Sequence, residues 1–133
     1  MMMASCGVSN RIAVDEETAI LLSHAQGQLA VLSTAIRLET PQEAIIMGTA
    51  GRIRIHSPWW RPCAMTLTRE GRSDETMEFP IAGNGYQFEA AEVMRCLCEG
   101  RSESCMMPLD ETLSIMKTLD AIRAQWGLRY PMD

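Results

Sequence analysis

A strand-like run from Gln28 to Leu38 carries apolar residues on both of its faces. Successive side chains of a strand point to opposite faces. One face therefore holds Leu29, Val31, Ser33 and Ala35, and the other holds Ala30, Leu32, Thr34, Ile36 and Leu38. A sheet with one face in water would show a polar face here. This strand therefore needs apolar cover on both sides, which strongly limits the folds that the chain can adopt.

Several neighbouring runs also have strand character. Residues 18–25 precede a turn at Gln26-Gly27, so they are expected to form a hairpin with the run 28–38. Further strands are predicted over 43–48 and 52–56, joined by the tight turn "TAG". The segments "AMTLTRE" and "ETMEFP" flank "GRSD" and predict two more. Strands this dense predict one antiparallel sheet.

After these strands the apolar period changes to that of a helix. The stretch "NGYQFEAAEVMRCLCEG" predicts a helix with a capping pair, Asn84 and Gln87, and a stop at Gly100. Its apolar stripe consists of Tyr86, Ala90, Val93, Met94 and Leu97. A second helix is predicted over "PLDETLSIMKTLDAIRAQWG", with Asp110 and Glu111 in its first turn. Its stripe consists of Leu109, Leu113, Met116, Leu119 and Trp126.

Strands followed by helices predict an α+β fold: a large, mostly antiparallel open sheet with helices on one face. Two helices cover only one face, so the other face is expected to be available for dimerisation. The alternative is that the N-terminus folds over it. Residues 1–12 are expected to be a frayed or disordered tail, and residues 13–133 a single domain.

Charge and composition exclude several classes of partner. The net charge is −5, Lys117 is the only lysine, and the arginines are scattered, which argues against nucleic acid. No apolar run is long enough to cross a membrane or to serve as a signal peptide. The cysteines, Cys6, Cys63, Cys96, Cys98 and Cys105, show neither a disulfide framework nor zinc spacing. Free thiols in the cytoplasm are the expectation.

The polar residues do not form a complete catalytic set. His24 and His56 lie far apart in sequence and are expected to be structural or surface residues. Glu89 and Glu92, or Asp110 and Glu111, could pair as acid and base, but solvated charge is the preferred interpretation. "GTAG" lacks the spacing of a dinucleotide loop, and "AGNG" suits a capped helix start better than an anion site. No catalytic, metal-binding or cofactor-binding residue is therefore predicted.

Three stretches, taken in order, resemble a known family. They are "ETPQEAIIMGTAGRIRIHSPWWRPCAMTL", "NGYQFEAAEVMRCLCEG" and "MPLDETLSIMKTLDAIRAQWGLRYP". This order and spacing resemble the C-terminal half of the Gfo/Idh/MocA oxidoreductases, in the dihydrodiol dehydrogenase branch. The resemblance covers about Val14 to Pro131.

The resemblance implies a C-terminal domain built on a large open sheet, with one face covered by helices and the other commonly used for dimerisation. It also implies an N-terminal Rossmann domain that binds NAD(P). The family's "E-K-P" lysine motif and its Asp/His catalytic positions have no counterpart here. The chain is therefore expected to bind no cofactor by itself and to be inactive alone.

The resemblance also implies a substrate-binding role for one turn. Family members of this branch have a "P-F-W-C-P"-like stretch whose Trp lines the substrate pocket. Here Trp60 matches that residue, Trp59 replaces an aromatic residue, and Arg61 departs from the pattern. An aromatic wall suits a sugar ring or a cyclic diol.

Three hypotheses remain open at this point. The chain is the substrate-binding and dimerisation domain of an NAD(P)-dependent dehydrogenase, with a Rossmann domain as partner. Alternatively, it is a non-catalytic module that pairs through its sheet with itself or with a separately encoded partner. The third hypothesis is an unstable remnant without function.

Overall fold

The computed structural model describes residues 2–9 and 14–127. The chain divides into two compact units. The first holds the N-terminal strands and the C-terminal helix, and the second is formed by the continuous segment Pro41–Ser104 between them.

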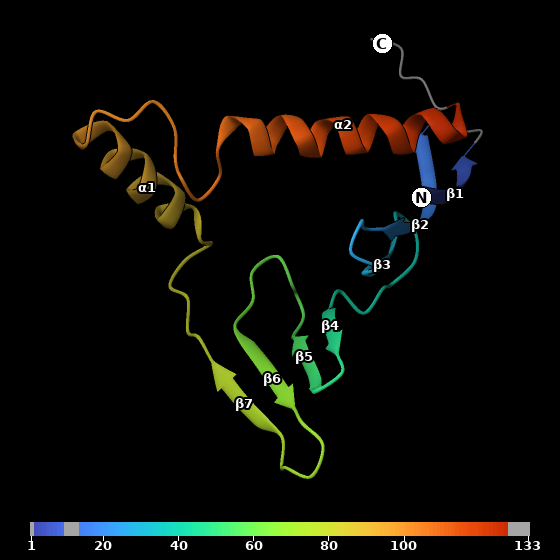
Figure 1. Cartoon of the computed structure of the whole chain (residues 1–133), viewed down its shortest axis with the longest axis horizontal. Helices are drawn as coiled ribbons and strands as arrows, with labels where there is room; N and C mark the ends of the chain where they lie inside the picture. Colours follow the sequence, from blue (N-terminus) through green and yellow to red (C-terminus); the bar gives the residue numbers. More distant parts are fainter. Residues whose placement is uncertain (1, 10–13, 128–133) are drawn as a thin grey trace. The chain divides into compact units, whose positions relative to one another are not determined.

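The first unit contains an antiparallel sheet and one helix (Figure 1). Its strands are β1 (Met2–Ser9), β2 (Val14–Ser23) and β3 (Leu29–Ala35), in that order across the sheet. The helix α2 (Leu109–Trp126) packs against β1. The predicted turn at Gln26-Gly27 is confirmed: the His24 N–H donates to the Gln28 carbonyl at 2.9 Å, and the Gly27 N–H donates to the His24 carbonyl at 3.0 Å.

The frayed tail expected over residues 1–12 differs from the structure. Residues 2–9 form β1, which pairs with β2 along its length and has an irregularity between Gly7 and Val8. Pairing there satisfies the backbone N–H and C=O groups of the β2 edge, which a tail would leave unpaired. Residues 10–13 of the expected tail and its boundary lie outside the described residues.

The second unit contains a four-stranded antiparallel sheet and the helix α1 (Tyr86–Cys98). The strands β4 (Ala44–Gly48), β5 (Gly51–Ile55), β6 (Ala64–Thr68) and β7 (Glu75–Glu78) follow one another in sequence order (Figure 1). The predicted α+β class and antiparallel pairing are confirmed. The strands are shared between two sheets, however, because β3 and β4 are not paired with each other.

Both predicted helix ends are confirmed by their capping geometry. After α1, Gly100 adopts φ 66°, its N–H donates to the Leu97 carbonyl, and the Arg101 N–H donates to the Cys96 carbonyl. This pair of bonds is the Schellman motif. At the start of α1, the Asn84 side chain accepts from the Tyr86 N–H at 3.2 Å and the Gln87 side chain accepts from the Gly85 N–H at 3.1 Å. The capping pair therefore acts around Gly85 rather than at Asn84 itself.

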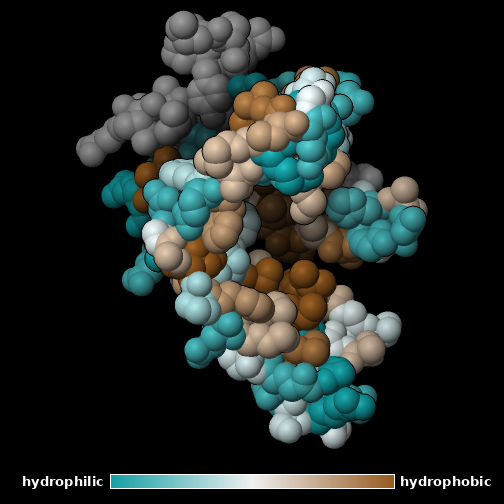
Figure 2. Space-filling model, turned by 90° about the vertical axis from the view of Figure 1, so that its left-hand side faces the viewer, coloured by the Kyte–Doolittle hydropathy of each residue, from teal (hydrophilic) through white to brown (hydrophobic). Residues whose placement is uncertain are grey.

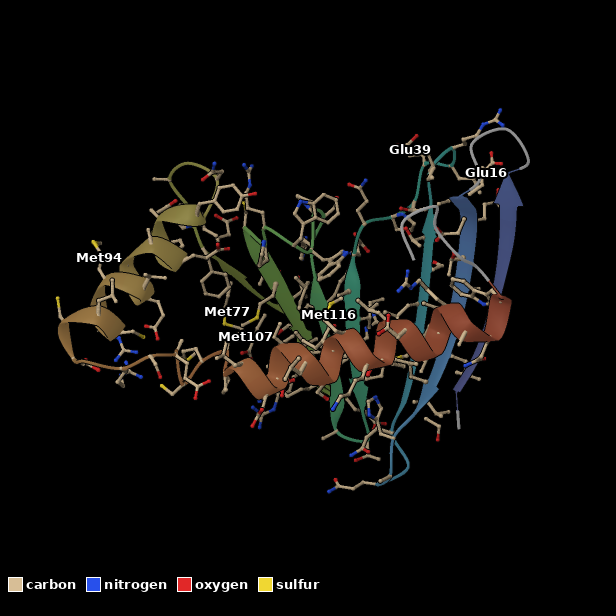
Figure 3. All side chains as sticks on the ribbon, turned by 90° about the horizontal axis from the view of Figure 1, so that it is seen from above. Glu16, Glu39, Met77, Met94, Met107 and Met116 are labelled. Carbon is tan, nitrogen blue, oxygen red and sulfur yellow. The ribbon has the colours of Figure 1, made fainter. Side chains whose placement is uncertain are left out.

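Little of the apolar surface is buried. Between residues 15 and 127 the buried apolar side chains are Cys96, 6% exposed, and Ile122, 5% exposed. The predicted stripes of both helices lie largely in solvent; only Trp126 of α2 is partly covered. Figure 2 shows apolar residues, in brown, open on the surface, and in Figure 3 Met94 projects outward from α1. Although 47% of the residues of the chain are hydrophobic, the side chains described between residues 15 and 127 enclose almost no core.

Candidate functional site

The turn between β5 and β6 presents the two adjacent tryptophans. The Arg61 N–H donates to the Pro58 carbonyl at 3.0 Å, which makes Trp59 and Trp60 the central residues of a four-residue turn. We call residues 58–61 the tryptophan turn. The indole rings pack edge to face, with centroids 6.2 Å apart and planes at 84°. Trp59 is 52% exposed and Trp60 is 60% exposed, so neither residue is core filler.

Backbone contacts hold the tryptophan turn against the segment that precedes β4. The Trp59 N–H donates to the Gln42 carbonyl at 2.9 Å. Gln42 itself adopts φ 52°, a left-handed conformation that is uncommon for a residue other than glycine. The Ser57-Pro58 peptide bond is cis. The two indoles are therefore displayed on a turn whose backbone is fixed at several points.

A polar row crosses the sheet of the second unit on the side where the tryptophan turn leaves it. His56 Nε2 lies 2.8 Å from Thr66 Oγ1, and Thr66 Oγ1 lies 2.9 Å from Thr76 Oγ1. These residues follow the strand register, in which Thr66 pairs with Thr76. His56 is half-buried and held by this row, in agreement with the structural role expected of it.

An ion pair joins β5 to the segment before β4. Arg54 Nε donates to Glu43 Oε2 at 2.9 Å, and a second bond joins Arg54 Nη2 to Glu43 Oε1. The hydrogen bonds from Arg54 lower the pKa of Glu43, and those to Glu43 raise the pKa of Arg54. Neither this ion pair nor the contact between Thr66 and Thr76 was predicted, because the alternation within a strand does not show which residues of neighbouring strands lie opposite each other.

Glu92, one of the carboxylates considered for acid–base work, forms a structural network. Its carboxylate accepts from Arg95 Nη2 and Nε at 2.8 and 2.9 Å, and from the Ser104 hydroxyl. These bonds, with Ser104 first, lower the pKa of Glu92 from 4.5 to about 2. A carboxylate with so low a pKa stays ionised and is a poor general acid. The preferred interpretation of Glu92 as charge, rather than as a proton donor, fits this geometry.

The remaining candidates lie apart from the tryptophan turn in sequence. Glu89, Asp110 and Glu111 are exposed on their helices, and His24 lies in the β2–β3 turn. Cys63, Cys96, Cys98 and Cys105 are free thiols, and the side chain of Cys6 lies outside the described ones. Within the described residues, no three His, Cys, Asp or Glu side chains converge as metal ligands would. Neither α1 nor α2 combines the length and hydropathy that a bilayer crossing requires.

The described residues do not suit a dinucleotide cofactor. A dinucleotide fold places its phosphates at a helix that follows a strand of a parallel sheet. Every strand pairing among the described residues is antiparallel. At the start of α1, the N–H groups of Gly85 and Tyr86 donate to the side chains of Gln87 and Asn84.

Known proteins similar to this chain are dehydrogenases. No family model matches the chain. It is 31% identical over 88% of its length to D-xylose 1-dehydrogenase (NADP(+)) of Hypocrea jecorina, of which it covers 34%. It is 31% identical over 94% of its length to trans-1,2-dihydrobenzene-1,2-diol dehydrogenase of Xenopus tropicalis, covering 39%. For the Homo sapiens enzyme of the same name, identity is 26% over 96% of the chain, covering 40%.

The chain thus spans between about a third and two fifths of the length of the curated relatives that it matches. The match takes in nearly all of the present sequence, up to 96% of it for the Homo sapiens enzyme. The resemblance noted in the sequence is thereby confirmed: the chain is similar to a part of dehydrogenases of the Gfo/Idh/MocA family.

Proposed function

We propose that this chain is the substrate-binding and dimerisation part of an NAD(P)-dependent oxidoreductase that acts on a sugar or a cyclic diol. The observation that carries this proposal is its similarity, over about nine tenths of its length, to parts of a xylose dehydrogenase and of dihydrodiol dehydrogenases. In this function the tryptophan turn forms a wall of the substrate pocket. Trp60 is the principal contact, and Trp59 supports it.

The exposed edge-to-face indoles support that role. An indole face stacks well on the apolar C–H face of a sugar or diol ring. The turn holds both rings in place before a ligand arrives, which lowers the entropy cost of binding. The described residues contain no group of His, Cys, Asp or Glu that could hold a metal ion. In this proposal, hydride transfer relies on a Rossmann domain as partner.

Two measurements on the purified chain test whether it binds substrate but lacks dehydrogenase activity by itself. The purified chain should not reduce NADP⁺ above background with a panel of aldoses and cyclic diols, followed at 340 nm. Binding should still be seen: adding D-xylose should shift the indole Nε1–H NMR signals of Trp59 and Trp60. Reduction of NADP⁺ by the chain alone would disprove its catalytic incompleteness. The absence of any indole shift with the whole panel would disprove the pocket wall.

The second part of the proposal is a homodimer formed through the sheet of the first unit. Leu29 and Val31 share one face of β3 and are 69% and 81% exposed, and Leu21 is directly opposite Val31 on β2. An exposed apolar face of this kind is typical of a surface that another protein covers. The non-catalytic alternative, a module that pairs with itself or with a separate partner, rests on the same face.

Sedimentation tests the dimer with a matched pair of variants. Val31→Glu places a charge on the Leu29–Val31 face, whereas Thr34→Glu places the same charge on the opposite face of the same strand. The parent chain and Thr34→Glu should sediment as dimers at micromolar concentration, and Val31→Glu as a monomer. A parent chain that stays monomeric throughout would eliminate pairing through this sheet.

A further inference from the structure

The side chain of Arg61 has no partner among the residues that the structure describes. Most arginines between residues 14 and 127 pair with a carboxylate, namely Arg37, Arg54, Arg69, Arg95, Arg101 and Arg123. The side chains of Arg52, Arg61 and Arg72 form no ion pair or hydrogen bond with any residue that the structure describes. In an acidic chain with more carboxylates than cationic side chains, an unpaired guanidinium is available for an outside anion.

The position of Arg61 distinguishes it from the other two. It follows Trp60 directly, in a turn that contains no acidic residue, and its side chain is exposed, as are those of Trp59 and Trp60. A guanidinium can stack on an indole face. Here the only ring contact of the two indoles within the described part of the chain is with each other. Arg61 is thus exposed and directly follows the aromatic pair in the same turn.

The backbone of Arg61 is held on both sides. Its N–H donates to the Pro58 carbonyl at 3.0 Å, and its carbonyl accepts a weak bond from Cys63 Sγ at 3.6 Å. The next residue is Pro62, which restricts the backbone conformation of the residue before it. Fixing the backbone in this way reduces the conformational freedom that a ligand must remove from the side chain.

We propose that Arg61 gives the tryptophan turn a preference for a ring that bears a carboxylate, such as an acidic sugar. The indoles contact the apolar face of the ring, and the guanidinium donates two parallel hydrogen bonds to the carboxylate. Arg can form such a paired contact, whereas the ammonium group of Lys cannot. This inference rests on the proposed function, because it names the substrate class of the same turn. An exposed ion pair is modest in strength, so the preference should be about three- to tenfold.

Matched sugars and matched variants test this preference. D-xylose, D-glucose and D-glucuronate share a pyranose ring and carry at C5 a hydrogen, a hydroxymethyl group and a carboxylate. Titrations of the whole chain are followed through the indole Nε1–H signals of Trp59 and Trp60, with Trp126 as an internal reference. D-glucuronate should bind about three- to tenfold more tightly than the neutral sugars. The difference should shrink in 0.5 M NaCl, since salt screens exposed charges.

Arg61→Gln should remove the preference for D-glucuronate over the neutral sugars, and Arg61→Lys should restore only part of it. Arg72→Gln is the control, because Arg72 is also exposed and unpaired but lies in the β6–β7 turn.

Equal binding of all three sugars, or a preference that survives Arg61→Gln, would overturn this inference alone. If no sugar shifts the indole signals of Trp59 and Trp60, both the inference and the proposed pocket wall are overturned. Signals that move only with protein concentration would make the turn a subunit contact, which also overturns the inference.

Discussion

Gly51 occupies a position in the β4–β5 turn that no larger residue fits. Its φ is 151°, and a Cβ added there would collide with the Thr68 backbone oxygen and lie 3.2 Å from Arg69 Cγ. The collision is with backbone of the paired strand β6, so it cannot be relieved by a side-chain rotation. The close approach of β5 to β6 at this end of the sheet therefore depends on glycine.

Gly51→Ala should destabilise the second unit by about 3 kcal/mol, the sum of backbone strain and overpacking. Chemical denaturation would measure the loss, and hydrogen exchange should show it in β5 and β6. Gly48→Ala is the matched control in the same turn, because its added Cβ would meet only the Gly51 carbonyl at an ordinary 3.8 Å. Equal loss in both variants would contradict the collision.

Hydrogen bonds to the Glu92 carboxylate connect α1 to the segment that follows it, and acid should weaken them. Its folded pKa of about 2 lies below the ordinary 4.5, so its stabilisation is fully present above pH 4.5 and is lost as the pH falls through about 2. Helix content followed by circular dichroism should therefore fall over this window. In Glu92→Gln the fall should be weaker and should start from a lower helix content, because the Ser104 and Arg95 contacts are already impaired.

Glu89→Gln is the control for this titration, because Glu89 is exposed on the same helix and is absent from the Glu92 network. It should reproduce the acid profile of the parent chain. A profile of Glu92→Gln identical to that of the parent would show that the network contributes nothing to the helix.

One face of the helix α2 is covered by its own unit, and the other face is exposed. Ile122 is the apolar residue of this helix that is buried, whereas Leu109, Leu113, Met116 and Leu119 are exposed. The helical period correctly predicted the bounds of α2, but of its predicted stripe only Trp126 is partly covered, and the stripe left out the buried Ile122. The helical period of the apolar residues shows which of them share a face of α2. Only the packing of α2 against β1 shows which face is covered.

Ile122→Ala should lower the stability of the unit formed by β1–β3 and α2 by about 2 kcal/mol or more, because it removes buried methyl groups. Leu113→Ala should cost less than about 0.5 kcal/mol in the monomer, as an exposed substitution does. Urea denaturation monitored at Trp126, on the same helix, would compare them. A larger loss in Leu113→Ala would mean that the exposed stripe is covered in solution.

For the whole molecule, the sequence predicted most of the elements and little of their assembly. Gly100, Gly127 and the Asn84–Gln87 pair mark helix ends through local hydrogen bonds and left-handed backbone, which are visible in a short window of sequence. The division of the strands into two sheets depends on whether β3 pairs with β4, and both are short apolar strands that could do so. No local pattern decides that pairing.

The candidate site, too, could be predicted only in part from the sequence. The family resemblance pointed to Trp59 and Trp60, but it did not show how far their side chains are exposed. Their exposure follows from the bond between Arg61 and Pro58 and from the contact with Gln42, which is distant in sequence. The availability of Arg61 likewise depends on where every carboxylate of the second unit lies, and that is a property of the fold.

The first unit is assembled from two ends of the chain, with the second unit made entirely from the residues between them. During synthesis, Pro41–Ser104 emerges complete before α2 exists, whereas β1–β3 must wait for α2. Contacts that close a loop of this length form slowly. Pulsed hydrogen exchange during refolding should protect β4–β7 before β1–β3. Earlier protection of β1–β3 would show that the N-terminal sheet forms without its helix.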